Sequence, residues 1–328
     1  MLSSWCDRLG SGMSRQPRVV FAEGDDPRVR SAANELAGRG VTPLLICEPR
    51  GSSGPAAGTV ELSAAVETTT AATLAEGQSG RRVEEIASRR GWPAALTAER
   101  RRDSLYLAAA VVDIGGADAC VAGSLNASGD VIRAGIHVLG LAPESQLLSS
   151  SFLLRMPDGR AMSFGDCAVV PEPDENQLAD IAISTARTFE TLTGETAAVA
   201  MLSFSTLGSA DHETVWRVRE ATRLVRKRTL ELAVEGELQF DAALVASVAH
   251  QKAAGSPVAG HANVFVFPNL SAGNIGYKIA ERLGGAQAFG PIIQGLRAPM
   301  NDISRGCSVS DIVNVAVISA LQARAQLR

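Results

Sequence analysis

The chain has 328 residues, of which 46% are hydrophobic, 20% are charged and only 4% are aromatic. This composition excludes a disordered chain and predicts about two folded domains with aliphatic cores. The net charge of −4 argues against nucleic acid as the main partner, because a phosphate backbone requires a basic face.

The cysteines and the apolar runs indicate a compartment. The five cysteines are scattered and form no CxxC pair, which argues against a disulfide framework and a zinc site and favours a reducing cytosol. The first residues, MLSSWCDRLGSG, lack the apolar run of a signal peptide, and no later stretch approaches the roughly 18 apolar residues of a membrane span. We therefore expect a soluble, cytoplasmic protein with no metal and no membrane partner.

The first predicted elements form a strand–helix–strand unit. An apolar run at 18–22 predicts a strand, and Asp26 is a natural N-cap for a helix with Pro27 at its first position. Gly40 is a natural end for this helix, and residues 42–47 predict the next strand. A helical crossover of this length implies parallel strands with a right-handed connection.

The following stretch is less regular. Residues 48–80 are rich in Gly, Ala, Ser and Thr, and we expect irregular surface structure there. Helices are predicted at 81–90 and 98–112, and a strand is predicted within 117–123.

From about residue 140 the pattern changes. Two extended runs around residues 157–159 (Pro-Asp-Gly) predict a hairpin, and apolar spacing predicts a helix over 175–192. Three strand–loop–helix repeats follow, and the last two predict helices in DAALVASVAH (241–250) and IGYKIAERL (275–283). The final helix, 312–326, is apolar almost all round and must be buried. The pattern predicts an α/β fold with a second sheet after about residue 140.

Several common catalytic signatures are missing. The sequence contains no GxGxxG, Walker loop, GxSxG or HExxH motif, so nicotinamide binding, nucleotide hydrolysis and the usual hydrolase chemistries lack support. The four histidines sit in unrelated contexts, and histidine base catalysis is therefore a poor first hypothesis.

Six blocks of the sequence together resemble one family. They are EGDDPR, ADACVAG, MLSFSTLGSADHETVWRVREATRL, GELQFDAAL, SPVAGHANVFVFPNLSAGNIGYKIAERL and GPIIQGLRAPMNDISRGCSVSDIV. The chain resembles the phosphate acetyltransferase (phosphotransacetylase) and phosphate butyryltransferase family from about residue 18 to its end. The most specific block is PxNDxSRG, with an aspartate seven residues after the serine.

The resemblance implies a fold and a reaction. The fold would have two α/β/α domains like those of the isocitrate and isopropylmalate dehydrogenases, with the active site in the interdomain cleft. The first domain would comprise 1–138 plus 292–328 and the second 139–291, in a homodimer. The reaction would be reversible acetyl transfer between coenzyme A (CoA) and phosphate. CoA or acetyl-CoA, phosphate and acetyl phosphate would be substrates, with no permanently bound cofactor.

The resemblance also assigns residues. By position, Ser304, Arg305 and Asp311 match the family's catalytic serine, arginine and aspartate, and Arg133 matches an arginine of its CoA site. The family's threonine-rich segment before this arginine is replaced here by NASGDVI, and Ala134 stands where a proline is usual. These departures concern CoA affinity and acyl preference rather than the type of reaction.

A second family arginine has no direct counterpart. It falls on Ala87 in EEIASRRG, and Arg89 or Arg90 can substitute for it because both lie within one helical turn.

The three catalytic candidates suit direct attack of a CoA thiolate in a ternary complex. Such a reaction needs an acid/base group, a cation and a donor for the tetrahedral oxyanion, which Asp311, Arg305 and Ser304 can provide. Proton transfer from a thiol to an ordinary aspartate is uphill by about 4.6 pKa units, or roughly 6 kcal/mol. Desolvation of the aspartate or stabilisation of the thiolate by Arg305 must reduce this difference.

Structural roles compete with these assignments. Ser308 and Asp311 form a capping box, Arg305 could be a surface ion pair and Ser304 a turn residue. Cys307 could form an acyl-enzyme, but no base is near it in the sequence, which favours small-residue packing instead.

Two polar turns could bind an anion through backbone N–H groups or could only cap helices. One is SFSTLGSAD, with Ser205, Thr206, Gly208 and Ser209, and the other is NLSAGN. Further candidates near strand ends and on the helix after NLSAGN are Gln239, Asp241, Tyr277 and Lys278.

Two rival functions remain open at this point. One is a phosphate acyltransferase for longer acyl groups, such as butyryl or propionyl. The other is a non-catalytic family member that binds CoA.

Overall fold

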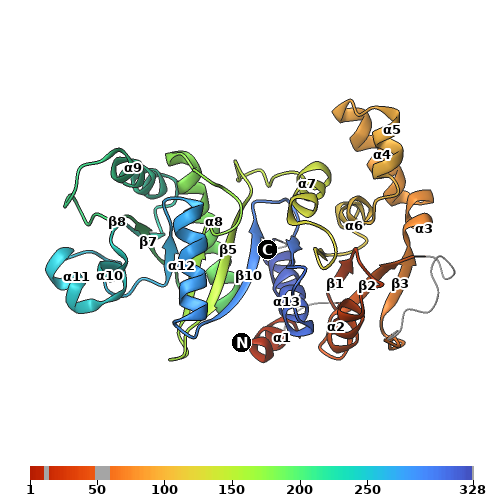
Figure 1. The fold of residues 1–328 in the computed structure, drawn as a ribbon, viewed down its shortest axis with the longest axis horizontal. Coiled ribbons are helices and arrows are strands. Elements are labelled where there is room, and N and C mark those ends of the chain that lie inside the picture. The colour runs from red at the N-terminus through yellow and green to blue at the C-terminus, as the bar shows by residue number, and fades with distance from the viewer. Residues whose placement is uncertain (11–14, 49–59, 327–328) are drawn as a thin grey trace. The chain divides into compact units, whose positions relative to one another are not determined.

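The computed structural model describes residues 1–10, 15–48 and 60–326. By their internal contacts these residues form two compact units, Met1–Ala142 with Leu296–Arg328, and Pro143–Gly295 (Figure 1). Each unit contains one β-sheet flanked by helices. The predicted α/β fold with two sheets is therefore confirmed.

The sheet of the first unit is parallel throughout. Its strand order is β11-β4-β1-β2-β3. The strands are β1 (Arg18–Phe21), β2 (Thr42–Cys47), β3 (Glu67–Thr70), β4 (Ala119–Ala122) and β11 (Met300–Asp302). Because the strands are parallel, the loops that follow them gather at one edge, where open α/β sheets usually bind ligands.

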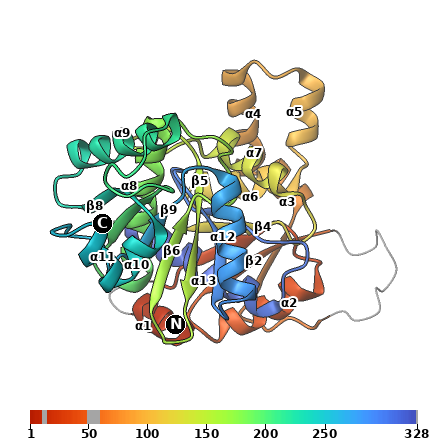
Figure 2. The same ribbon diagram turned by 60° about the vertical axis from the view of Figure 1, so that its left-hand side comes forward.

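Helices cover both faces of this sheet. Helices α2 and α13 pack on one face and α6 and α7 on the other, while α4 and α5 lie side by side beyond α6 (Figures 1 and 2). The helices are α1 (Leu2–Gly10), α2 (Pro27–Ala37), α3 (Ala71–Glu76), α4 (Gln78–Arg90), α5 (Ala94–Arg100), α6 (Ser104–Asp113), α7 (Ser128–Val138) and α13 (Val309–Gln326). The apolar α13 is buried along most of its length, as its sequence predicts.

The second unit has a mixed six-stranded sheet of order β10-β5-β6-β9-β7-β8. The pairs β10/β5 and β5/β6 are antiparallel and the rest are parallel. The strands are β5 (Ser149–Arg155), β6 (Ala161–Gly165), β7 (Ala198–Leu202), β8 (Ala233–Leu238), β9 (Val264–Val266) and β10 (Gln287–Gln294). Strands β5 and β6 form the predicted hairpin.

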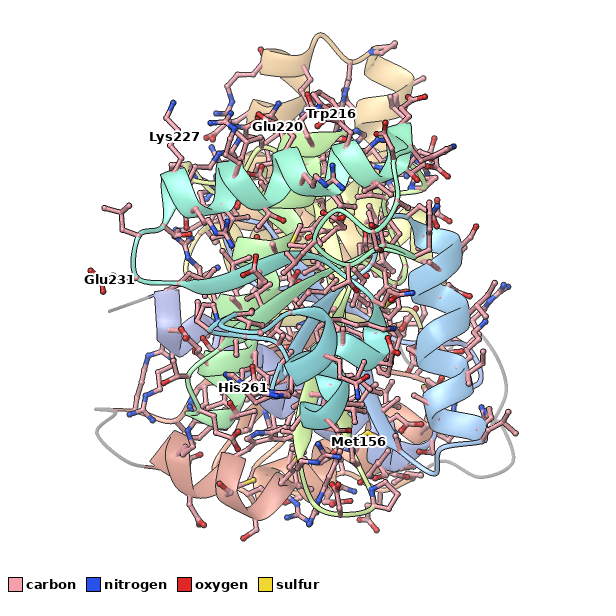
Figure 3. The ribbon with its side chains drawn as sticks, turned by 90° about the vertical axis from the view of Figure 1, so that its left-hand side faces the viewer. Met156, Trp216, Glu220, Lys227, Glu231 and His261 are labelled. Atoms are coloured by element: carbon pink, nitrogen blue, oxygen red, sulfur yellow. The ribbon has the colours of Figure 1, made fainter. Side chains whose placement is uncertain are left out.

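Five helices belong to the second unit: α8 (Glu175–Thr193), α9 (Glu213–Arg228), α10 (Phe240–Leu244), α11 (Ala246–Lys252) and α12 (Leu270–Arg282). Helix α8 packs across the sheet and against α9. Trp216, Glu220 and Lys227 lie along α9 in Figure 3, and Trp216 is 58% exposed. Helix α8 confirms the helix that the sequence predicts over 175–192.

Two sequence predictions in the first unit are wrong. Part of 48–80 is regular, because β3 adds a fifth strand and α3 follows it directly, whereas 49–59 lie outside the described residues. The β-branched residues of ETTT suit an edge strand. The helix predicted over 98–112 is two helices, because the Asp103 side chain accepts from the Leu105 N–H at 2.9 Å and caps α6.

Two predicted helices in the second unit also differ. The helix expected in DAALVASVAH is broken at Val245, which ends α10 and precedes α11. Helix α12 begins at Leu270, earlier than its apolar residues indicate, because the Asn269 side chain accepts from the Ala272 N–H at 3.0 Å.

Candidate active site

Three catalytic candidates lie in the connection between β11 and α13. Ser304 and Arg305 are exposed, and the turn is closed by the Cys307 N–H, which donates to the Ser304 carbonyl at 2.9 Å. The Ser304 hydroxyl oxygen accepts the Gly306 N–H at 3.2 Å, which leaves its own proton available for donation. The Arg305 guanidinium makes no hydrogen bond or ion pair with any residue in the described ranges.

Asp311 takes part in a capping box. Its Oδ2 atom accepts the Ser308 N–H at 2.9 Å and the Ser308 hydroxyl at 2.8 Å, while the Asp311 N–H donates to that hydroxyl at 3.2 Å. The cap is therefore present, as the spacing indicates. Asp311 is exposed, and its Oδ1 atom accepts no hydrogen bond from the part of the chain that the structure describes. One oxygen can cap the helix while the other accepts a proton.

Arg28 fixes the backbone of this turn. Its Nη1 atom donates to the carbonyl of Arg305 at 2.7 Å and to that of Cys307 at 3.1 Å. Its Nη2 atom donates to the carbonyl of Ser124 at 3.0 Å and to Asp26 at 2.7 Å. One guanidinium therefore joins the start of α2, the loop after β4 and the turn that holds Ser304 and Arg305. The sequence analysis missed this residue, although it ends the EGDDPR block.

Glu23 organises the loop after β4. Its buried carboxylate accepts backbone N–H groups from four consecutive residues, at 2.8–3.1 Å, and the Ser124 hydroxyl at 2.8 Å. Successive N–H groups of this kind form an anion-binding nest, and here an internal carboxylate fills it. The donors belong to Gly123, Ser124, Leu125 and Asn126.

Asp302 is a buried acid at the end of β11. It is 3% exposed, and its Oδ1 atom has no hydrogen-bond partner among the described residues. This oxygen packs against Gly123, where an added Cβ would lie 2.2 Å from it. Burial, with a further contribution from the charge of Glu23, raises the pKa of Asp302 to about 6. Glu23 begins the EGDDPR block and Asp302 is the aspartate of PxNDxSRG, but the sequence analysis assigned a role to neither, because their contacts with the loop after β4 depend on the fold.

Cys307 is poorly suited to a covalent route. It is 8% exposed, and burial raises the pKa of its thiol, with a smaller increase from the charge of Asp311. The Arg28 guanidinium lowers the pKa but does not reverse the shift. A thiol that stays protonated at neutral pH is a weak nucleophile, and packing is the simpler role.

Arg133 lies in the middle of α7, the helix that follows the loop after β4. Its side chain is 50% exposed and its Nη1 atom pairs with Asp130, one turn earlier, at 2.6 Å. An exposed pair of this kind contributes little to stability, so the guanidinium can exchange Asp130 for a ligand phosphate.

The structure separates the two arginines near Ala87. Ala87 is 2% exposed and lies on the buried side of α4. Arg90 donates to the carbonyls of Ile136 at 3.0 Å and His137 at 3.2 Å, at the end of α7. Arg89 is exposed and makes no hydrogen bond or ion pair within the described ranges. Arg90 thus lies beside the helix that carries Arg133, whereas Arg89 has no such anchor.

The polar turn of the second unit is satisfied internally. Ser205 and Thr206 are buried, and the Ser205 hydroxyl and the Gly208 N–H donate to Glu237 at 2.8 and 2.9 Å. The Ser209 hydroxyl accepts the Thr206 N–H at 2.9 Å. In this conformation these groups support the turn itself, and their assignment to a ligand stays a prediction.

Glu237 is the centre of that turn. It is 1% exposed, and Arg219 donates to both of its oxygens, at 2.7 and 3.0 Å. Burial alone would raise the pKa of Glu237, but the hydrogen bonds from Arg219, Gly208 and Ser205 lower it to about 2.

The remaining candidates also have internal partners. Lys252 donates to Gln239 at 2.9 Å and pairs with Asp241 at 3.0 Å. Tyr277 stacks on Phe152 with ring centroids 4.0 Å apart. None of these contacts distinguishes a binding role from a structural one.

Within the described ranges, no group of three or more His, Cys, Asp or Glu side chains is placed to hold a metal ion. No helix in the same residues is long and apolar enough to cross a membrane.

Comparison with known proteins identifies the family. The family model described as phosphate acetyl/butaryl transferase matches residues 8–320. The chain belongs to this family. A phosphate acetyltransferase of Paracoccus denitrificans is 42% identical over 311 residues, covering 93% of this chain and 95% of the relative. A phosphate acetyltransferase of Thermoanaerobacterium thermosaccharolyticum is 40% identical over 316 residues, covering 95% and 96%.

The fold comparison agrees with the sequence comparison. The EutD phosphotransacetylase from Staphylococcus aureus superposes with a TM-score of 0.87 at 37% identity and 98% coverage of both chains. The resemblance stated from the sequence blocks is therefore confirmed at the level of family and fold.

Proposed function

We propose that this chain is a phosphate acetyltransferase that transfers an acetyl group reversibly between CoA and phosphate. The observation that carries the proposal is the connection from β11 to α13. There the exposed guanidinium of Arg305 and the hydroxyl of Ser304 precede a carboxylate, Asp311, with one oxygen not used by its cap. The 40% identity over 316 residues to a phosphate acetyltransferase supports the same reaction.

The three groups divide the chemistry. The Oδ1 atom of Asp311 takes the proton of the CoA thiol, and the thiolate attacks the carbonyl carbon of acetyl phosphate. Arg305 stabilises the thiolate and the phosphoryl oxygens by charge, and the Ser304 hydroxyl donates to the oxyanion of the tetrahedral intermediate. Collapse of this intermediate breaks the bond between carbon and the phosphate oxygen, which releases phosphate and acetyl-CoA.

A basic surface of the first unit would hold the phosphates of CoA. We assign Arg90 and Arg133 to it, because Arg90 is anchored on α7, the helix that carries Arg133. Arg89 is kept as a second, more mobile contributor from the same turn of α4. In the second unit, Ser205, Thr206, Gly208 and Ser209 are assigned to ligand binding through their turn, which their internal bonds hold in shape.

A single assay tests the reaction. Purified protein incubated with acetyl-CoA should release CoA only when phosphate is added, in the presence of EDTA as well as without it. CoA release that is independent of phosphate, or abolished by EDTA, would contradict the proposal. Butyryl-CoA and propionyl-CoA in the same assay separate an acetyltransferase from an enzyme for longer acyl groups, and binding without turnover would indicate the non-catalytic alternative.

We further propose a homodimer in the cytoplasm. All five cysteines are free thiols, which suits a reducing compartment. The outer side of α12 carries a row of exposed apolar side chains at helical spacing, Ile275, Ile279 and Leu283, at 58%, 53% and 85% exposure, and a second copy would cover it. Sedimentation of wild type and of Ile279→Glu tests this, since the variant should be monomeric. A wild-type monomer would contradict the proposed dimer.

A further inference from the structure

An aromatic cluster lies beneath the basic surface of the first unit. The hydroxyl of Tyr106 on α6 lies 2.7 Å from Nδ1 of His137 on α7. The Trp92 ring, just after α4, lies 5.3 Å from the His137 ring and 5.8 Å from the Tyr106 ring between centroids. Tyr106 is 1% exposed, so His137 is held by a rigid, buried partner.

Three arginines surround this histidine. Arg90 donates to the His137 carbonyl, Arg133 lies one turn earlier on α7, and the guanidinium carbon of Arg100 lies 4.6 Å from the centre of the Tyr106 ring. Burial lowers the pKa of His137, and the charges of Arg90, Arg100 and Arg133 lower it further. The imidazole is therefore neutral at pH 7.

The acids in this region only partly offset the arginines. Asp103 pairs with Arg100 at 3.1 Å, Glu99 lies 3.7 Å from the same guanidinium, and Asp130 pairs with Arg133 at 2.6 Å. Arg90 has carbonyl partners but no carboxylate partner among the described residues. An arriving anion would therefore change the potential at His137 strongly.

We propose that His137 is a proton-linked positioning residue of this surface, neutral when the surface is empty and protonated when a phosphate dianion is held between Arg90 and Arg133. The inference rests on the proposed function and adds a titrating group to its CoA site. Its backbone carbonyl anchors Arg90 and its ring packs between Trp92 and Tyr106, so the residue spaces the two arginines as well as sensing their ligand.

The proton comes from solvent and converts the imidazole to an imidazolium ion. The contact with Tyr106 survives this change, because a tyrosine hydroxyl can donate to a neutral imidazole nitrogen and accept from a protonated one. The bound phosphate attracts the positive charge of the imidazolium, and this attraction offsets the repulsion by the arginines. By linkage, a ligand that raises the proton affinity of His137 must itself bind more tightly as the pH falls, by at most tenfold per pH unit.

The test measures proton uptake with adenosine 3′,5′-bisphosphate, which carries phosphates without the reactive thiol. Calorimetric titration in two buffers of different ionisation enthalpy, at pH 6.3 and pH 8, gives the number of protons exchanged. Wild type should take up more protons than His137→Asn at pH 6.3, by up to one, and the two should agree at pH 8. The asparagine amide keeps a partner for Tyr106 but does not titrate, and subtraction cancels protons exchanged by the ligand itself.

His250→Asn is the matched control, because His250 is exposed on α11 in the second unit; it should behave as wild type. Equal proton uptake in wild type and His137→Asn at both pH values, with intact binding, would overturn the inference. Failure of wild type to bind either CoA or the bisphosphate would instead contradict the proposed function. If His137→Asn does not fold, NMR titration of the four histidines in wild type decides: the pKa of one must rise on ligand addition, and unchanged pKa values overturn the inference.

Discussion

Two polar turns that look alike in the sequence differ in what their side chains are bonded to. Both the turn after β11 and the turn after β7 follow a buried strand and precede a helix. After β7, Glu237 accepts the Ser205 hydroxyl and the Gly208 N–H of the turn and is itself paired with Arg219. After β11, Arg28 donates to the backbone carbonyls of Arg305 and Cys307, and the Arg305 guanidinium is left without a partner among the described residues. Polar groups that the fold does not satisfy are the better indicator of a working site.

Replacing the open groups should have the largest effect. Asp311→Asn keeps an oxygen that can accept the Ser308 cap, so the free energy of unfolding should fall by about 1 kcal/mol or less. Turnover should fall by about 10²–10⁴, because the amide cannot accept the thiol proton. It should recover partly as the pH approaches the pKa of the CoA thiol, because the thiolate then forms without a base. Urea unfolding and the CoA-release assay measure both. A variant with wild-type turnover and lowered stability would reduce Asp311 to a cap.

Replacing the centre of the satisfied turn should show the opposite pattern. Glu237→Gln removes the charge that two Arg219 hydrogen bonds compensate, and unfolding free energy should fall by about 2–3 kcal/mol with turnover per folded molecule retained. The pKa of Glu237 is lowered to about 2, so its contribution is full above about pH 4.5 and is lost as the pH falls toward 2. Urea unfolding between pH 7 and pH 3 tests this. Lost turnover in a stable variant would make this turn a site.

The sequence predicted the elements around both turns and the residues of the candidate site, but not the long-range hydrogen bonds that distinguish the two turns. The elements were predictable where periodicity and caps are local, as for the helix after Asp26 and the apolar α13. The site block was predictable from the residues that match the family. The hydrogen-bond partners of this block were not predictable, because Arg28 lies 277 positions from Arg305. Only the parallel sheet brings the loops after β1 and β11 to the same edge. The same limit explains why SFSTLGSAD could not be distinguished from an open anion site.

The basic surface extends the comparison to substrate binding. Arg133→Ala should raise the KM for CoA by roughly tenfold with little change in the KM for acetyl phosphate, because a charge-assisted contact to phosphate acts mainly in ground-state binding. Arg223→Ala is a matched control, since Arg223 forms an exposed pair with Glu220 at the same helical spacing. Steady-state kinetics with each substrate varied in turn measures the ratio. Equal increases in both KM values would mean that Arg133 supports the fold instead.

The smallest expected effect concerns Asp302, a buried carboxylate whose charge lowers the free energy of unfolding. The pKa of Asp302 is raised to about 6, so the folded state holds its proton more tightly than the unfolded chain does. The contribution of Asp302 to stability is therefore most favourable below about pH 3.8 and falls as the pH rises through about 6, above which the full cost of its buried charge applies. The shift bounds this cost at about 3 kcal/mol.

Asp302→Asn should recover about 1 kcal/mol at pH 8, because the neutral amide avoids the buried charge but introduces an N–H₂ group that needs its own partners. The gain should shrink as the pH is lowered from 6 toward 4, where wild type is already protonated. Thermal unfolding of both proteins across this range provides the measurement. A gain that does not change with pH would show that packing against Gly123, rather than charge, limits stability at this position.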